Sequence, residues 1–137
     1  MKNKPKISDH TSFTFRKEER LCSKKLIDRL FAEGSSFISY PIKVVFIPVK
    51  LASTFPVQAG FSVSKKNFKR AVKRNRIKRL MREAYRLNKY GLYQKLKDRQ
   101  LAAFFIYIGK ELPDYKPIEN AIKKAFLSIQ KKLEEGA

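Results

Sequence analysis

Several residue types that build catalytic and metal sites are scarce in this sequence. Among 137 residues there is one cysteine, Cys22, one histidine, His10, and no tryptophan. A single cysteine cannot form an internal disulfide, and one cysteine with one histidine cannot complete a zinc site. A serine-histidine triad would have to use His10 from a polar N-terminal stretch, and no serine stands in a G-x-S-x-G context. The composition therefore argues against a catalytic site built by the protein alone.

Long apolar runs are also missing. No stretch of about 18 apolar residues occurs, as a membrane-spanning helix would need. The N-terminus MKNKPKISDHTS has no apolar signal core, and neither end carries a lipidation motif. We therefore expect a cytoplasmic protein that does not bind a membrane.

Acidic residues are few beside the basic ones. Lysine and arginine number 32 against 12 aspartate and glutamate, so the net charge is +20, while the hydrophobic fraction of 43% is that of a folded domain. A folded domain this basic repels itself, and a bound polyanion relieves the repulsion. Acids near the first expected helix, such as Glu18 and Glu19, should form solvated ion pairs rather than a metal site. Nucleic acid is the expected partner class.

Hydrophobic periodicity predicts one domain with seven elements in the order αβββαβα. Helices are expected at about 23–33, 70–89 and 118–133, and strands at about 35–39, 42–50, 57–64 and 101–109. Ser23 can cap the first helix, and Gly34 can end it in a left-handed turn. The run 101–109 is apolar throughout, which is typical of a strand covered on most of its surface. Residues 1–14 are expected to form a flexible basic arm, 15–134 the folded domain, and 135–137 a disordered end.

The most basic stretch is RAVKRNRIKRLMREAYR, Arg70 to Arg86, which holds eight cationic side chains and one acid, Glu83. Apolar residues repeat at helical spacing from Ile77 onward, so the stretch predicts an amphipathic helix. At about 100° per residue, the basic side chains fall on the side away from that apolar stripe. With acids nearly missing, pairing within the helix cannot neutralise this charge. The pattern favours contact with a polyanion over a solvated charged face.

A longer stretch, AGFSVSKKNFKRAVKRNRIKRLMREAYR (residues 59–86), resembles the signature of the protein subunit of bacterial ribonuclease P. The upstream stretch FRKEERLCSKKLIDRLFAEG is similar to that family's opening segment, so the likeness covers about residues 15 to 130. The resemblance implies an α+β fold: a single-domain αβββαβα sandwich, ribosomal protein S5 domain 2-like, with helices packed on a mixed four-stranded sheet.

The resemblance also implies a division of labour. In that family the RNA subunit performs magnesium-dependent hydrolysis at the 5′ end of the mature tRNA sequence, and the protein binds the RNA subunit and the single-stranded 5′ leader. The implied partners are thus ribonuclease P RNA and precursor tRNA, with no obligate protein partner. Mg²⁺ would be required by the holoenzyme, with no cofactor bound by the protein alone. The residues implied at the RNA subunit are Lys69, Arg70, Lys73, Arg74, Asn75, Arg76, Lys78, Arg79, Arg82 and Arg86.

The leader is implied to lie between the first helix and the open face of the sheet, where aromatic rings can stack on bases without reading sequence. The implied residues are Ile27, Phe31, Lys43, Val45, Ser62, Ser64, Lys65 and Lys66. Ile27 and Val45 stand where the family has aromatic side chains, which departs from its pattern. Phe46 is adjacent to Val45 and could face either the leader or the core. For Phe31 and Ile27, core packing is the alternative interpretation.

Two other functions remain open at this point. One is a general RNA-binding or ribosome-associated module with no role in cleavage, and the other is a basic protein that compacts DNA. Compaction does not require an open sheet face beside a basic helix, so the sequence favours it least. Reconstitution with an RNA subunit would separate the other two.

Overall fold

The structure is a computed structural model that describes residues 15–52 and 54–136. It confirms the predicted order of helices and strands and adds one short 3-10 helix before them. The elements are η1 (Lys17–Glu19), α2 (Lys24–Glu33), β1 (Ser35–Ser39), β2 (Ile42–Pro48), β3 (Val57–Val63), α3 (Ala71–Leu96), β4 (Leu101–Tyr107) and α4 (Tyr115–Gly136). The arm expected over residues 1–14 lies outside the described residues.

The four strands form one mixed sheet in the order β1-β2-β4-β3. β1 pairs antiparallel with β2, β2 antiparallel with β4, and β3 parallel with β4. β4 therefore has a neighbour on each side, and its alternate side chains join hydrophobic clusters on both faces of the sheet, which explains why its sequence is apolar throughout. The mixed four-stranded sheet with helices packed on it confirms the α+β fold that the sequence predicts.

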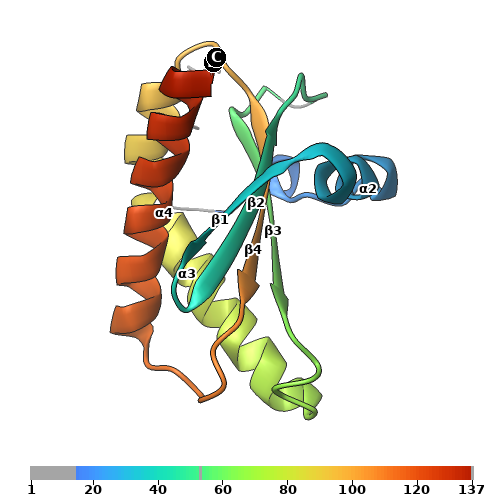
Figure 1. The fold of residues 1–137 in the computed structure, drawn as a ribbon, viewed down its shortest axis with the longest axis vertical. Coiled ribbons are helices and arrows are strands. Elements are labelled where there is room, and N and C mark those ends of the chain that lie inside the picture. The colour runs from blue at the N-terminus through green and yellow to red at the C-terminus, as the bar shows by residue number, and fades with distance from the viewer. Residues whose placement is uncertain (1–14, 53, 137) are drawn as a thin grey trace, which may run out of the picture.

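Helices cover the two faces of the sheet unequally (Figure 1). α3 and α4 pack against one face and enclose the main hydrophobic core. α2 crosses the other face, where a smaller hydrophobic cluster forms around its one fully buried residue, Leu30. Burying a leucine side chain contributes about 1.5–3 kcal/mol, so Leu30 is the main anchor of α2. The rest of this face is left open around the helix.

Phe46 belongs to the main core. Successive side chains of a strand point to opposite faces, and Val45 accordingly lies in the smaller cluster beneath α2. Phe46 is only 2% exposed, and its ring centroid lies 6.1 Å from that of Phe37. The open question about Phe46 is thereby answered: it faces the core and not the leader side.

α2 begins where the sequence predicts, because the Ser23 hydroxyl oxygen accepts a hydrogen bond from the Leu26 N–H at 3.2 Å. The left-handed turn expected at Gly34 is wrong, since its φ is −73°. A Cβ at Gly34 would lie 2.5 Å from the Leu30 carbonyl oxygen and 2.9 Å from that of Phe46. The close approach of two backbone carbonyls, and not the handedness of the turn, requires glycine here.

Both long helices extend beyond their predicted ends. α3 continues for two further turns past residue 89 because Leu92 and Leu96 carry on its buried stripe. α4 ends at Gly136, so it includes residues 135 and 136 of the end that the sequence analysis expects to be disordered. β2 and β4 each end two residues earlier than predicted. Despite these lengths, no helix in the described part of the chain is apolar enough to cross a membrane.

Candidate nucleic-acid interface

The cationic face of α3 is arranged as the sequence predicts. Ile77, Met81 and Ala84 are fully buried against the core, and the basic side chains lie on the opposite side. The exposed residues are Lys69, Arg70, Lys73, Asn75, Arg76 and Arg79, and the half-buried ones are Arg74, Lys78, Arg82 and Arg86. We call these ten residues the cationic face of α3; they run from the two residues before the helix through about its first four turns, where a polyanion can reach them.

Arg74 differs from its neighbours because its guanidinium already has partners. Its Nη1 donates hydrogen bonds to the carbonyl oxygens of Phe68 and Lys69, each at 2.8 Å. These bonds hold the turn that leads from β3 into α3. Arg74 therefore shapes the basic loop as well as carrying charge, and its removal should loosen the loop.

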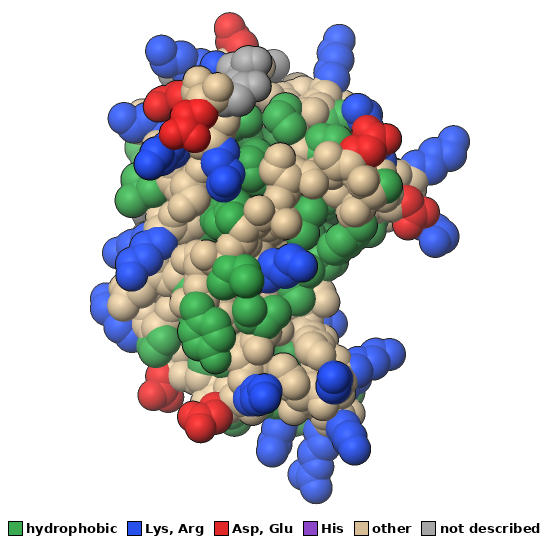
Figure 2. Space-filling view, in the orientation of Figure 1, with side chains coloured by type: hydrophobic (Ala, Val, Ile, Leu, Met, Phe, Trp, Pro, Cys, Tyr) green, Lys and Arg blue, Asp and Glu red, His purple; other side chains and the backbone are tan. Residues whose placement is uncertain are grey.

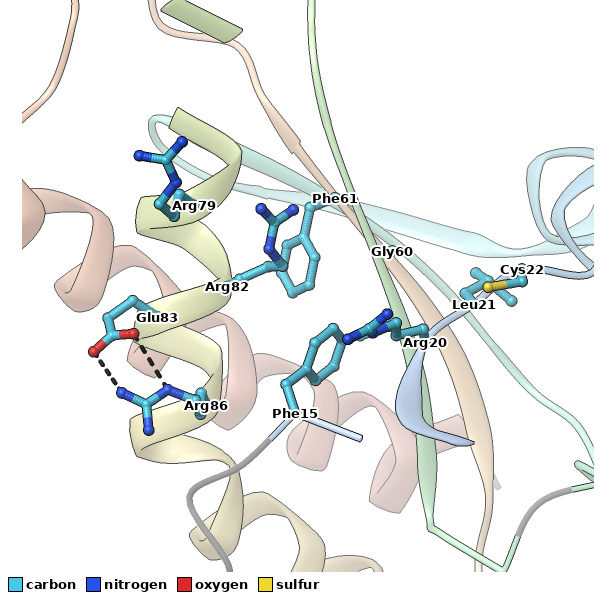
Figure 3. Close-up of a pocket in the computed structure, with 11 residues that line it drawn as sticks. Phe15, Arg20, Leu21, Cys22, Gly60, Phe61, Arg79, Arg82, Glu83 and Arg86 are labelled. Atoms are coloured by element: carbon cyan, nitrogen blue, oxygen red, sulfur yellow. Dashed lines mark hydrogen bonds and ion pairs between the residues drawn. The ribbon is translucent and has the colours of Figure 1, made fainter. Parts of the chain in front are cut away.

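A pocket of about 570 Å³ lies between α3, β3 and the segment around η1. Three of its arginines come from α3, and a fourth comes from the residue that follows η1. The principal lining residues are Arg20, Arg79, Arg82 and Arg86, with the rings of Phe15 and Phe61 (Figure 3). We call it the arginine pocket.

Positive charge in the arginine pocket is only partly neutralised. Glu83 is the one acid among its described lining residues, and it binds Arg86, with distances of 3.2 Å to Nε and 2.6 Å to Nη2 (Figure 3). Partial burial, followed by the charges of Arg79 and Arg20, lowers the pKa of Arg82. Its guanidinium remains protonated at neutral pH. The pocket therefore favours an anion that guanidinium forks can bind bidentately, such as a phosphate.

Arg20 is a candidate binding residue that sequence reasoning missed. Its backbone forms a parallel bridge with Ala59 of β3, and the Leu21 N–H donates to the Ala59 carbonyl oxygen at 3.0 Å. This pairing brings Arg20 to the arginine pocket, where its guanidinium lies 5.8 Å from the Phe15 ring centroid. The sequence shows only that Arg20 is a basic residue in the stretch FRKEER. No neighbouring residue indicates which strand this segment pairs with.

The open face of the sheet brings together most of the residues implied for the leader. Strand register places Lys43 opposite Ile106 and Val45 opposite Phe104, with Ser62 beside Ile106 on β3. Alternation puts all of these side chains on the face that α2 crosses. Figure 2 shows the outline of the molecule hollowed between α2 and the start of α3, with hydrophobic side chains at its base and lysines and arginines at its rims.

An aromatic pair lies on this face. Phe31 of α2 is 50% exposed, so it is not a core residue, and its ring meets that of Phe104 edge-on with centroids 5.3 Å apart. Ile27, by contrast, is partly buried in the cluster beneath α2. Gly60 lets the pair form, because a Cβ there would run into the Phe104 ring. Sequence reasoning missed Phe104, since a continuous apolar run gives no sign of which residues face outward.

The basic loop follows β3. The Ser64 hydroxyl oxygen accepts a hydrogen bond from the Lys66 N–H at 3.2 Å, which fixes the turn. Lys65 and Lys66 are exposed. The loop thus presents two flexible cations between the open sheet face and the cationic face of α3.

Glu19 does not form the solvated ion pair expected from the sequence. Its carboxylate and the Lys89 ammonium are both fully buried, with 2.6 Å between Oε1 and Nζ. Burial lowers the pKa of Lys89, and the hydrogen bond and charge of Glu19 oppose that shift. Burial also raises the pKa of Tyr93, whose hydroxyl donates to Glu19 Oε1 at 2.6 Å. The expectation was wrong because η1 docks on α3, a contact 70 residues away in the chain.

A metal site is not found in the described part of the chain. Within residues 15–52 and 54–136, no group of three or more histidine, cysteine, aspartate or glutamate side chains lies close enough to hold an ion. Cys22 is exposed and unpaired by disulfide.

A protein-family model for Ribonuclease P matches residues 15–134 of this chain. The chain belongs to the ribonuclease P protein family. The ribonuclease P protein component of Porphyromonas gingivalis strain W83 is 44% identical over 123 residues, covering 86% of this chain and 88% of that protein. The component from Chlorobium phaeobacteroides is 35% identical over 129 residues, covering 85% and 88%.

Solved structures of ribonuclease P proteins share the fold. The protein from Thermotoga maritima is 26% identical with a TM-score of 0.51, covering 85% of this chain and 93% of that one. The Staphylococcus aureus protein has a TM-score of 0.63 at 24% identity, covering 84% and 97%, and supports the fold alone. The family and fold class that the sequence resemblance implied are confirmed.

Phe104 lies next to the position where the family resemblance implies an aromatic side chain on a strand. The resemblance described in the sequence analysis implies an aromatic side chain at the position of Val45. Phe104 is the direct cross-strand partner of Val45 and lies on the same face. An aromatic ring is therefore present on this face, one strand away from the expected position.

Proposed function

We propose that this chain is the protein subunit of a cytoplasmic ribonuclease P that binds the catalytic RNA subunit and the 5′ leader of precursor tRNA. It assists magnesium-dependent endonucleolytic removal of the leader, which forms the mature 5′ end. The RNA subunit carries out the hydrolysis. The observation that carries the proposal is the family match over residues 15–134, which spans both the cationic face of α3 and the open sheet face.

The cationic face of α3 is assigned to RNA phosphates. Its arginines are exposed or half-buried, and few acidic side chains lie near enough to neutralise them. An arginine guanidinium can bind two oxygens of one phosphate at the same time. The arginine pocket adds Arg20 to this set. Such contacts release counterions from the RNA, so affinity should fall steeply with salt.

The open sheet face is assigned to the leader. Phe31 and Phe104 expose aromatic surface on which unpaired bases can stack, and stacking tolerates any base sequence. Lys43, Lys65 and Lys66 lie at its margins, where they can meet the leader backbone. A grip of this kind suits a substrate whose leader varies in sequence.

Magnesium is assigned to the RNA. Carboxylate and phosphate oxygens are the ligands that Mg²⁺ prefers, and the described part of this chain does not gather carboxylates into a site. RNA supplies phosphate oxygens in abundance. The chain's own contribution is electrostatic, because its cations offset phosphate repulsion that would otherwise require more metal ions.

Reconstitution tests the proposal. With the RNA subunit, precursor tRNA and limiting magnesium, we expect single-turnover cleavage to be faster, or to need less substrate, when this protein is added. The protein without RNA should cleave nothing. Robust cleavage by RNA-free protein would overturn the assignment of hydrolysis to RNA. RNA binding that leaves cleavage unchanged would instead support a general RNA-binding module.

Arg79→Ala is expected to weaken binding to the RNA subunit and to flatten the dependence of log K on log salt by about 0.7–0.9, the range for one phosphate contact in single- and double-stranded nucleic acid. Arg79 is exposed, so the melting temperature should hardly change. Arg99→Ala is the matched control, because Arg99 is also exposed but follows α3 at its far end. Filter binding across a salt series measures both slopes. An unchanged slope with a lower melting temperature would assign Arg79 to packing.

A further inference from the structure

The segment from Phe15 to Leu21 forms one wall of the arginine pocket. It contributes the Phe15 ring and the Arg20 guanidinium, which face the arginines of α3 across the pocket (Figure 3). The parallel bridge between Arg20 and Ala59 attaches this segment to the edge of β3. A second attachment is needed to fix its distance from α3.

The buried pair Glu19–Lys89 supplies that second attachment. Three donors converge on the Glu19 carboxylate: Lys89 Nζ at 2.6 Å and the Tyr93 hydroxyl at 2.6 Å on Oε1, and the Arg16 N–H at 2.9 Å on Oε2. The Tyr85 hydroxyl in turn hydrogen-bonds with that of Tyr93 at 2.7 Å. Glu19 and Lys89 are both 0% exposed, so solvent does not weaken these directional contacts.

The positions of the two residues link the pair to the pocket. Lys89 follows Arg82 by seven residues, about two helical turns, so both side chains leave α3 on the same side. Glu19 immediately precedes Arg20 in the chain. The ion pair therefore ties the side of α3 that carries Arg82 to the segment that carries Arg20.

A buried ion pair adds little net stability over an apolar pair of the same volume. The ion pair instead fixes the position of η1 relative to α3, because several donors must lie at hydrogen-bond distance from one carboxylate. An apolar contact at this place would let η1 shift along α3. The convergence of three donors on the Glu19 carboxylate thus points to a role in fixing position.

We propose that Glu19 and Lys89 are positioning residues that hold Arg20 beside Arg82, so that the arginine pocket binds a backbone phosphate of RNA. This inference rests on the proposed function, since it concerns an RNA contact of the same protein. The phosphate can belong to the RNA subunit or to precursor tRNA, and both are nucleic-acid phosphodiesters. Neither Glu19 nor Lys89 touches the RNA, because both are fully buried.

The test is a double-mutant cycle between Lys89→Met and Arg20→Ala in the full chain. Binding is measured in two arms, protein to RNA subunit and holoenzyme to precursor tRNA, which identify the source of the phosphate. In one arm, each single variant should weaken binding by roughly five- to tenfold and flatten the dependence of log K on log salt by about 0.7–0.9, the range for one phosphate contact. The double variant should bind no more weakly than either single one. Lys89 is buried, so a loss of salt slope on its removal must act through another residue.

Two controls separate positioning from stability. Ile129→Ala removes a fully buried side chain of α4 in the main core and should lower the melting temperature while keeping full affinity. In Lys89→Met, hydrogen exchange should quicken at the Leu21 amide while the amides of β4 stay protected. Glu19→Leu combined with Lys89→Met removes both buried charges and should fold, yet it should still lose affinity because the directional contacts are gone, which covers the case in which Lys89→Met does not fold.

Three results would overturn the inference. Losses that multiply in the double variant would mean that Lys89 acts independently of Arg20. A loss of affinity in Ile129→Ala as large as in Lys89→Met would mean that stability alone is responsible. Full affinity of Arg20→Ala in both arms would mean that the pocket binds no phosphate. In all three cases accelerated cleavage on reconstitution would still support the proposed function, which the cycle does not measure.

Discussion

Replacing Lys89 with methionine is expected to lower the free energy of unfolding by about 3–5 kcal/mol. Methionine keeps the length and apolar stem of lysine but leaves the Glu19 carboxylate fully buried without its ammonium partner. An uncompensated buried charge is among the most destabilising changes in a protein interior. Urea denaturation followed by circular dichroism measures the loss.

Two further variants make this stability test specific. Glu19→Leu combined with Lys89→Met removes both charges and should recover most of the lost stability, because apolar pairs can replace buried ion pairs. Lys95→Met changes an exposed lysine on the same helix and should stay within about 0.5 kcal/mol of the unmodified protein. A loss below about 1 kcal/mol in Lys89→Met would contradict the buried, directional contact described above.

Replacing both rings of the open face, Phe31→Leu with Phe104→Leu, is expected to weaken holoenzyme binding of precursor tRNA by about 1–3 kcal/mol for each ring that stacks on a base. Leucine keeps apolar volume but lacks the flat ring face. Binding of mature tRNA, which has no leader, should hardly change. Equilibrium binding of the two tRNAs to the same holoenzyme measures the difference.

Phe46→Leu is the matched control for the ring variants. Phe46 undergoes the same chemical change, but it lies in the main core on the opposite face of the sheet. We expect it to lower stability without altering the preference for precursor over mature tRNA. Equal losses for both tRNAs in the Phe31 and Phe104 variants would remove these rings from the leader site.

Hydrophobic spacing and capping residues predicted most helices and strands, because the position of each element depends mainly on residues close together in the sequence. The spacing from Ile77 to Ala84 fixes which side of α3 is buried, and the basic side follows from the same geometry. The hydroxyl of Ser23 marks the start of α2. The error at the end of α3 arose where the buried residues Leu92 and Leu96 prolonged packing beyond the clear part of the pattern.

Long-range contacts could not be predicted in the same way. Nothing near Glu19 in the sequence indicates a lysine 70 positions later, and burial reversed the expectation that an acid among cations is solvated. Arg20 reaches its pocket through backbone pairing with Ala59, which has no local signature. Phe104 sits in an apolar run whose outward residues depend on strand register. The sequence therefore predicted the cationic face but not the pocket beside it.

The assigned RNA contacts remain predictions about two surfaces that the fold holds side by side. α2 rests on one side of the sheet through Leu30, while α3 rests on the other through its buried stripe. The loop with Lys65 and Lys66 joins the two surfaces. A substrate with a phosphate backbone and unpaired bases can contact both, which a small-molecule ligand could not.

The most direct test of the central claim is the ratio of the dissociation constant for mature tRNA to that for precursor tRNA. It is measured for the RNA subunit alone and for the RNA subunit with this protein, at the same magnesium and salt concentrations. If the protein grips the leader, it should raise the ratio by at least about tenfold, the equivalent of one stacked base. A ratio that the protein leaves unchanged would contradict the account.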